Sequence, residues 1–533
     1  MEEKRNMKKL LSIVILLAAA LSFTSCVKDL DIQNKNGLST GMFWKTQDDM
    51  NAGLNAVYNM FYRQGTWTRN IYTQLNGMAD DGVSYAGWTE LNEWTKFKYT
   101  DYNFGEGTLK IWREHYTAIN RANQVLDHID DPAVVFDSED TRKDMKGQAL
   151  WLRSFYYFYL TALYDNEPLC LKTSSAGDQP ANSNPDEIFT QLEKDLIEAI
   201  DYLPLTRDKE KARPTKGSAY GLLAKVYAQH HNWTKAAECL EWIIEGQGKS
   251  MYSLEPKWQD NFSCKTENNK ESLYEIQFSL CNYVGFDQTD NYLDANAQLA
   301  TQIEVNQSPK NEGWNNVEAN RWIVEYFKRE KTTDGEFDPR LYYTCWYREM
   351  DADFPQHGIT RMYNKTWAEY KYSDADNKRV FIKKYSTDVF PLYYWNDNNF
   401  RSIRLADMML LYAEVLNEIN NAPNAKAIGY VDAIRTRVKL PKLSQSTYYT
   451  DPKILTDYKA FKEHLKIERA LELAFECVRW IDQKRWGFDE QTVAAYRAVD
   501  VDYNAFVLNK HERLPLPQIE VDNNPNLEQN PNY

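Results

Sequence analysis

Apolar side chains recur every three to four positions through the first half and the last quarter of the chain. This period is typical of amphipathic helices and predicts helices over residues 50–61 and 111–129. Residues 139–164 are apolar on nearly all sides in their C-terminal half, which indicates a helix buried on several faces. Pro185 with two following acidic residues opens another helix, which runs through Leu203 and ends at Pro204.

Two pairs of helices are separated by very short breaks. A helix over 214–231 is followed by a break at Asn232 and a second helix over 233–245, and the same order recurs at 403–419 and 424–439. Helices joined by so short a turn pack antiparallel. The pairs resemble tetratricopeptide units, although the spacing between them is irregular.

The amino-acid composition changes between about residues 246 and 400, where Asn, Asp, Tyr, Trp and Gly are frequent. Short strands are expected at 273–278 and 380–385, and a helix at 321–327. Long loops on a helical scaffold are usually functional. We therefore expect a mainly α protein, in which tetratricopeptide-like helix pairs form a scaffold and long loops with short β-strands carry the ligand face.

The N-terminus reads as an export signal. Lys8 and Lys9 precede an apolar run over 10–21, and small residues lead directly into Cys26. Twelve apolar residues are too few to cross a bilayer, which needs about 20. Cys26 is therefore predicted to be the lipidated first residue of the mature chain, with ordinary signal-peptidase cleavage beside a chance cysteine as the alternative.

These patterns divide the chain into four parts. They are a lipoprotein signal peptide over 1–25, an N-terminal part with helix pairs over 26–245, a loop-rich ligand-facing part over 246–400, and a C-terminal part with further helix pairs over 401–533.

The formal charge of −14 and the lack of a basic stripe disfavour nucleic acid and polyanionic ligands, so no nucleic-acid partner is expected. The cysteines are widely spread, with no C-x-x-C, so no metal site is expected and no cofactor either. Only Cys264 and Cys281 are close enough in a loop-rich stretch to test as a disulfide.

Patterns for catalysis are absent. Gly248-Lys249-Ser250 lacks the upstream glycine of a phosphate-binding loop, and neither H-E-x-x-H nor G-x-S-x-G occurs. Asp80 with Asp81, and Glu336 with Asp338, are carboxylate pairs that we interpret as solvated loop charges rather than catalytic pairs. The chain is therefore not expected to be an enzyme.

Aromatic residues make up 14% of the chain, with 36 Tyr and 16 Trp. Most must lie in the core, and Trp112, Trp151, Trp242, Trp480 and Trp486 fall in helical patterns that place them there. Planar rings on loops also suit neutral sugars, because the C–H face of a pyranose packs on an aromatic face.

Several segments in order along the chain resemble the SusD/RagB family. They are the start CVKDLD, FWKTQDDMNAGLNAVYN at 43–59, YTAINRANQVLDHI at 116–129, GQALWLRSFYYFYLTALYDNEPL at 147–169, and IERALELAFECVRWIDQKRWG at 467–487. Residues 246–400 match least. The resemblance implies a lipid-anchored, surface-exposed protein of the outer membrane that acts as a lid on a TonB-dependent, SusC-like transporter and binds ligand without covalent chemistry.

Aromatic loop residues are the candidate ligand contacts. Trp88 and Trp94 follow Asp80-Asp81, and Trp314 lies in NEGWNNVEANRW, which is similar to the family's Gly-Trp segment. Tyr283, Phe286 and Tyr292 are second candidates. For each ring the alternative is packing beneath its own loop.

Three functions are consistent with the sequence. The first is a lipoprotein that binds oligo- or polysaccharide for uptake, which the aromatic loops and acidic charge favour. The second is a peptide-binding, RagB-like uptake lipoprotein with the same fold and partner. The third is an enzyme or a structural adaptor on this scaffold.

Overall fold

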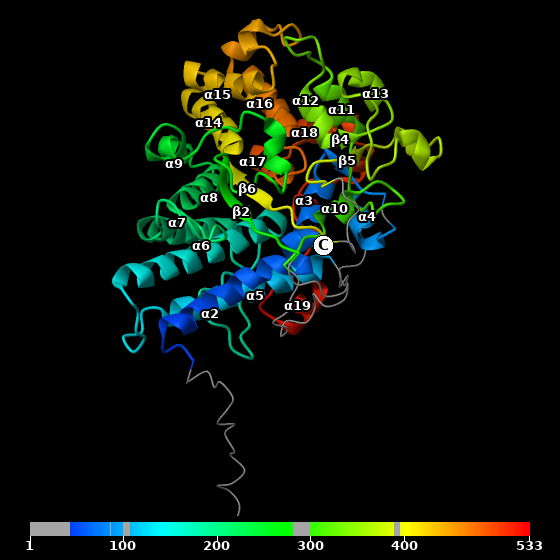
Figure 1. Ribbon diagram of the computed structural model, residues 1–533. Coiled ribbons are helices and arrows are strands. Elements are labelled where there is room, and N and C mark those ends of the chain that lie inside the picture. Colours follow the sequence, from blue (N-terminus) through cyan, green and yellow to red (C-terminus); the bar gives the residue numbers. More distant parts are fainter. Residues whose placement is uncertain (1–42, 86, 100–106, 281–298, 388–394) are drawn as a thin grey trace, which may run out of the picture.

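The computed structural model describes residues 43–85, 87–99, 107–280, 299–387 and 395–533. The fold is mainly helical, as expected (Figure 1). Its helices are α2 Gln47–Tyr58, α3 Asn70–Met78, α4 Thr89–Thr95, α5 Thr108–His128, α6 Glu139–Leu163, α7 Pro185–Tyr202, α8 Lys216–Gln229, α9 Trp233–Ile244, α10 Ile303–Gln307, α11 Arg321–Phe327, α12 Pro339–Thr344, α13 Met350–Asp353, α14 Leu405–Asn420, α15 Ala425–Arg437, α16 Tyr458–Glu472, α17 Arg479–Trp486, α18 Glu490–Val499 and α19 Gln518–Asn523. Its strands are β1 Gly82–Val83, β2 Ser272–Ile276, β3 Glu318–Ala319, β4 Cys345–Trp346, β5 Phe381–Ile382 and β6 Phe400–Arg404.

A stack of helices forms one side of the molecule. Each helix contacts the next in the series α5, α6, α7, α8, α9, α14 and α15, although α14 follows α9 only after more than 150 residues (Figure 1). The predicted helix boundaries at 185–203, 214–231 and 424–439 agree with α7, α8 and α15 to within a few residues. The predicted scaffold of helix pairs is therefore confirmed.

Local capping explains why the pairs turn where they do. His231 takes a left-handed backbone conformation with φ of 56°, and the Asn232 side chain accepts a hydrogen bond from the Lys235 N–H at the start of α9. Between α14 and α15, Asn421 has φ of 50° and the Asn424 side chain accepts from the Ala427 N–H at 2.9 Å. Asn caps the second helix of both pairs, and in the second pair it also takes the left-handed position, which Asn tolerates.

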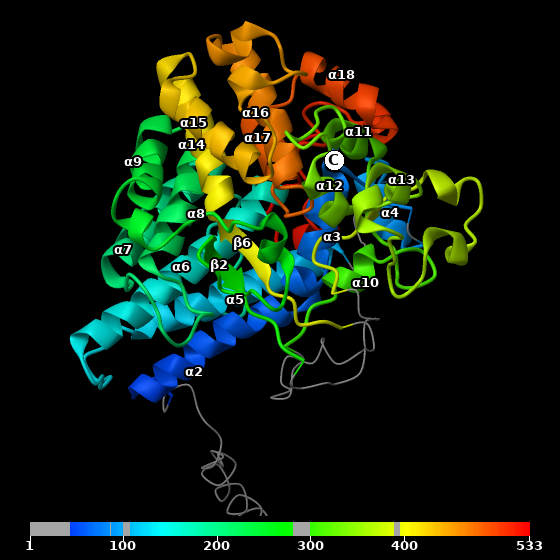
Figure 2. The same cartoon turned by 45° about the horizontal axis from the view of Figure 1, so that its top comes forward.

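The loop-rich side has short elements and its own hydrophobic core. Helices α3, α4, α10, α12 and α13 gather there, away from α7 and α9 (Figure 2). Antiparallel two-stranded sheets pair β1 with β3, β2 with β6, and β4 with β5. The predicted strands at 273–278 and 380–385 correspond to β2 and β5, both shorter than expected. The second core contains, among others, Leu91, Val317, Ile323, Phe327, Trp346 and Phe381.

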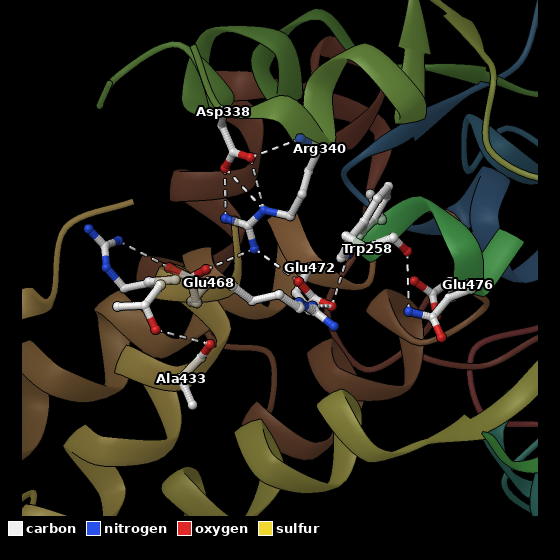
Figure 3. A network of polar contacts seen from close by, with 12 residues as sticks. Trp258, Asp338, Arg340, Ala433, Glu468, Glu472 and Glu476 are labelled. Atoms are coloured by element: carbon white, nitrogen blue, oxygen red, sulfur yellow. Dashed lines mark hydrogen bonds and ion pairs between the residues drawn. The ribbon is translucent and has the colours of Figure 1, made fainter. Parts of the chain in front are cut away.

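A buried network of charges joins α16 to the loop-rich side (Figure 3). The Arg340 guanidinium donates to Asp338 at 2.7 Å, to Glu468 at 2.9 Å and to Glu472 at 3.1 Å. Glu472 also accepts from Trp258 Nε1 at 3.0 Å, and its other ion pairs include one to Arg404. Asp338 is buried, so its interpretation as a solvated loop charge was wrong; the ion pair to Arg340 compensates the cost of burying its charge. Glu336 is exposed, as expected.

The tryptophans assigned to the core divide into two groups. Trp112, Trp151 and Trp480 are buried, as expected. Trp242 and Trp486 are only half-buried: Trp242 stacks on Tyr220 with ring centroids 4.2 Å apart, and Trp486 Nε1 donates to Glu414 at 2.9 Å.

Candidate functional site

Two of the predicted aromatic residues meet around one arginine. The Cζ atom of Arg69 lies 4.1 Å from the ring centroid of Trp88 and 4.7 Å from that of Trp314. Both rings are half-buried, so each keeps part of its surface toward solvent. We call Arg69, Trp88 and Trp314 the tryptophan platform.

The loop that carries Trp314 is fixed against α10. The Trp314 N–H donates to the Val305 carbonyl at 2.8 Å. A Cβ on Gly313 would lie 2.6 Å from the same oxygen, so only glycine permits this approach. Asn311 and Asn315 on either side have left-handed φ of 80° and 50°. The backbone therefore sets the position of the Trp314 ring before any ligand arrives.

The segment that carries Arg69 is also connected to α10. Its carbonyl accepts from the Thr73 N–H at 3.1 Å in the first turn of α3. The neighbouring Thr68 carbonyl accepts from the Gln302 N–H at 2.9 Å, just before α10 begins. Backbone hydrogen bonds thus connect the segments of Arg69 and Trp314 through α10.

A buried carboxylate holds α10 itself. Glu304 accepts hydrogen bonds from Asn396 Nδ2 at 2.7 Å, Tyr363 Oη at 2.8 Å and Thr387 Oγ1 at 2.8 Å. Burial raises the pKa of Glu304, although these donors oppose the rise. The support beneath the platform is therefore polar and specific.

The β1–β3 pairing brings the segments of Trp88 and Trp314 together. Gly82 pairs with Ala319, and the Asn320 N–H donates to the Asp81 carbonyl at 2.7 Å. A Cβ on Gly82 would lie 1.7 Å from the Asn76 carbonyl oxygen, which only glycine avoids. Trp88 follows this ladder by a few residues and occupies the N-cap position of α4.

The platform offers a flat apolar surface beside a fixed cation. A guanidinium stacks on aromatic faces and still directs its N–H groups outward in its own plane. Such an arrangement suits an uncharged ligand that has an apolar face and polar edges.

Trp94 does not belong to this surface, and its selection as a ligand contact was wrong. The ring has no exposed area, and its centroid lies 3.8 Å from that of Tyr99. Leu91 and Trp94 are three residues apart on α4, so both point inward on the same helical face. Trp88, at the cap, lies outside this repeat.

The other predicted site residues lie outside the described part of the chain. These are the lipidation residue Cys26 and the second candidate ring contacts Tyr283, Phe286 and Tyr292. Cys281, the proposed partner of the exposed Cys264, lies outside it as well.

Arg69 is the site residue that sequence reasoning missed. It lies in the segment TWTRNIYTQL, where every neighbour from Gln64 to Met78 is buried. The segment is mostly polar in sequence, so nothing in its pattern marks Arg69 as more exposed than its neighbours. Its contact with two rings depends on residues far away in the sequence, so its role could not be read from that stretch.

Comparison with known proteins identifies the family. One family model, described as the SusD family, matches residues 270–533, and a second, described as starch-binding and associating with the outer membrane, matches residues 30–228. The chain belongs to the SusD/RagB family. Together the two models cover most of the predicted mature chain.

Relatives in this family match almost end to end. SusD-like protein P2 of Formosa agariphila is 26% identical over 98% of this chain and 99% of its own length. The starch-binding protein SusD of Bacteroides thetaiotaomicron is 22% identical over 99% of both chains.

Solved structures show the same fold. A SusD superfamily protein from Bacteroides vulgatus has a TM-score of 0.76 at 25% identity, covering 92% of this chain and all of that one. A laminarin-binding SusD-like protein has a TM-score of 0.72 with the same identity and coverage.

Membership in the SusD/RagB family confirms that the chain is not an enzyme. The buried pair Asp80 and Asp81 has another use, and its interpretation as solvated charge was wrong. Asp80 accepts from the Arg479 guanidinium at 2.6 and 2.8 Å. Burial, then the charge of Asp80, raises the pKa of Asp81 to about 7.

The description of one family model agrees with the expected association with the outer membrane. None of the helices in the described ranges has the length and hydropathy needed to cross a bilayer. Within the same ranges, no group of three or more His, Cys, Asp or Glu side chains is arranged to hold a metal ion.

Proposed function

We propose that this chain is a surface lipoprotein that captures oligo- or polysaccharide at the tryptophan platform and acts as a lid for a TonB-dependent, SusC-like transporter of the outer membrane. The observation that carries the proposal is that one guanidinium lies 4.1 and 4.7 Å from two half-buried tryptophan rings. These residues come from three distant segments, all fixed by backbone hydrogen bonds.

Binding follows from the chemistry of the platform. A sugar ring packs its C–H face on Trp88 or Trp314, and its hydroxyl groups accept hydrogen bonds from Arg69. Because the rings are held before the ligand arrives, little conformational entropy is lost on binding. The acidic net charge of −14 disfavours polyanionic glycans, so an uncharged glycan is the proposed ligand class.

A neutral glucan is the first ligand to test. A relative at 25% identity is described as laminarin-binding, and another at lower identity as starch-binding. The family likeness supports the role as a transporter lid, and the predicted lipid attachment at Cys26 would hold the chain at the membrane by its N-terminus.

Peptide binding is the alternative within the same family. Rings and an arginine also accommodate peptides, whose backbone would take the hydrogen bonds offered to hydroxyl groups. No contact of the platform favours a peptide over a sugar, and the alternative is therefore an outcome of the test.

The test is a binding screen on the mature chain without its lipid. Affinity electrophoresis in gels that contain laminarin or starch would show retarded migration of the wild type, and calorimetry with a mixed tryptic peptide pool would show no heat of binding. Binding to peptides without binding to either polysaccharide would replace the proposal with the peptide alternative. Analysis of sugars after incubation would show no hydrolysis products.

A further inference from the structure

A cavity with both apolar and charged lining residues lies beside the β1–β3 ladder. It has a volume of about 550 Å³ and is lined by Tyr85 and Lys96 on either side of α4, by residues 318–321, by Arg379, and by Asp500–Asp502. This volume is in the range of small-molecule binding sites. We call it the Tyr85 cavity.

An exposed ring stands at its edge. Tyr85 is 55% exposed, which is high for so large a side chain. The Arg379 Cζ lies 4.8 Å from its ring centroid and the Lys96 Nζ 5.5 Å. Arg379 is itself held by an ion pair to Asp376 at 3.0 Å and by a second to the buried Glu318.

Two charged groups on the cavity wall keep their hydrogen-bonding capacity. Among the described residues, neither the Lys96 ammonium nor the Asp502 carboxylate has a hydrogen bond or ion pair to another side chain. Asp500 is fixed, because its carboxylate accepts from the Asp502 N–H at 3.0 Å. The cavity therefore presents a donor, an acceptor and an aromatic ring, with the 77% exposed Val501 at the rim.

The cavity and the tryptophan platform lie at opposite ends of α4. Trp88 is the N-cap of this helix and Lys96 its C-cap. At 1.5 Å per residue, the two caps are about 12 Å apart. Tyr85 and Trp88 are also separated by only three positions in the sequence. One extended ligand can therefore contact both places.

We propose that the Tyr85 cavity is a second contact site for the same glycan, taking an uncharged sugar residue of a chain already bound at the tryptophan platform. This inference rests on the proposed function. The ring of Tyr85 packs against the sugar, and Lys96 and Asp502 hydrogen-bond to its hydroxyl groups. Two linked contacts raise the affinity for a long chain above that of either site alone.

The test compares Tyr85→Ala and Asp502→Asn with Trp314→Ala, using calorimetric titration with laminarin and with starch. Tyr448→Ala is the matched control, because Tyr448 is 47% exposed and lines neither site. We expect Tyr85→Ala and Asp502→Asn each to weaken the affinity of the bound polysaccharide about three- to tenfold at unchanged melting temperature. Tyr448→Ala should retain wild-type affinity.

The two proposals fail in different ways. If Trp314→Ala weakens binding while Tyr85→Ala and Asp502→Asn do not, the second site is wrong and the proposed function stands. If the wild type binds neither polysaccharide, the proposed function and this inference are both wrong. An equal loss in Tyr448→Ala would also overturn the inference, because the effect would not belong to the cavity.

Discussion

Arg69 is a residue that a lysine cannot replace. Its planar guanidinium lies over two rings, whereas the ammonium of a lysine is a compact, strongly hydrated charge without a stacking face. Stacked cation–aromatic contacts are worth about 0.5–2 kcal/mol. Arg69→Lys should therefore weaken laminarin binding about three- to tenfold, measured by calorimetry.

The melting temperature of the Arg69→Lys variant should stay close to that of the wild type. Because Arg69→Lys keeps the positive charge, the variant tests the planar geometry of the guanidinium alone. Wild-type affinity in Arg69→Lys would mean that the guanidinium plane has no part in the site.

Asp81 predicts a pH dependence of stability. Its pKa is raised to about 7, by burial first and then by Asp80, and neither carboxylate oxygen has a hydrogen-bond partner among the described residues. The folded state therefore binds a proton that the unfolded state, with a pKa of about 3.9, releases. From about pH 4 to 7 this group lowers the free energy of unfolding as the pH rises.

Asp81→Asn should remove this fall in the free energy of unfolding with rising pH. Urea denaturation at pH 5 and pH 7.5 is expected to show a smaller drop in the free energy of unfolding for the variant, by about 1–3 kcal/mol. Asp80→Asn is the control: it breaks the ion pair to Arg479 and should destabilise the fold at both pH values. A drop identical to that of the wild type would contradict the raised pKa.

At the scale of elements, the buried charge network joins α16 to the loop-rich side. Arg340 neutralises Asp338, Glu468 and Glu472, all fully or nearly fully buried. Removing one partner of such a group leaves uncompensated buried charge, which costs about 3–5 kcal/mol. Arg340→Met should lower the free energy of unfolding by that amount in urea denaturation.

Arg321→Met provides the comparison for this prediction. Arg321 pairs with the exposed Glu325 and Glu349, and surface pairs contribute about 0–1 kcal/mol. Similar losses in both variants would mean that the network does not stabilise the fold through buried charge.

Helix pairs could be predicted because their signals are local. Asn232 and Asn424 are helix N-caps that mark the turns from the local sequence, and the period of apolar residues predicts the helices on either side. Trp88 and Trp314 could be selected as loop rings, but their meeting depends on a two-residue ladder between β1 and β3. So short a pairing leaves no pattern in the sequence.

Burial was the main source of error. Trp94 was predicted to be a loop ring after Asp80-Asp81, yet it lies on α4, which turns it inward. Asp80 and Asp338 were interpreted as loop charges because the sequence does not show their partners. Arg479 is far from Asp80 in the chain, and the Arg340 side chain folds back onto Asp338 two residues before it. The sequence shows charges but not which of them become buried together.

At the scale of the whole molecule, the proposed binding face lies on a helical scaffold, and the predicted lipid at Cys26 attaches the protein to the membrane at one point. If Cys26 carries the lipid, Cys26→Ala should move nearly all of the protein from the membrane fraction to the soluble fraction, because acyl chains supply most of the membrane affinity. Fractionation in a strain without the partner transporter checks this.

Retention of Cys26→Ala in that membrane fraction would contradict the lipid anchor. Cys264→Ala, at an exposed cysteine of the described chain, is the control and should stay with the membrane as the wild type does.

The central claim is that glycan binds at Arg69, Trp88 and Trp314, and calorimetric titration of laminarin into the Trp88→Ala/Trp314→Ala double variant tests it most directly. Each lost ring contact is worth about 1 kcal/mol or more, so affinity should fall about 30-fold or further at nearly unchanged melting temperature. Trp242→Ala, which removes a half-buried tryptophan on α9, should bind as the wild type does. Wild-type affinity in the double variant would contradict the account.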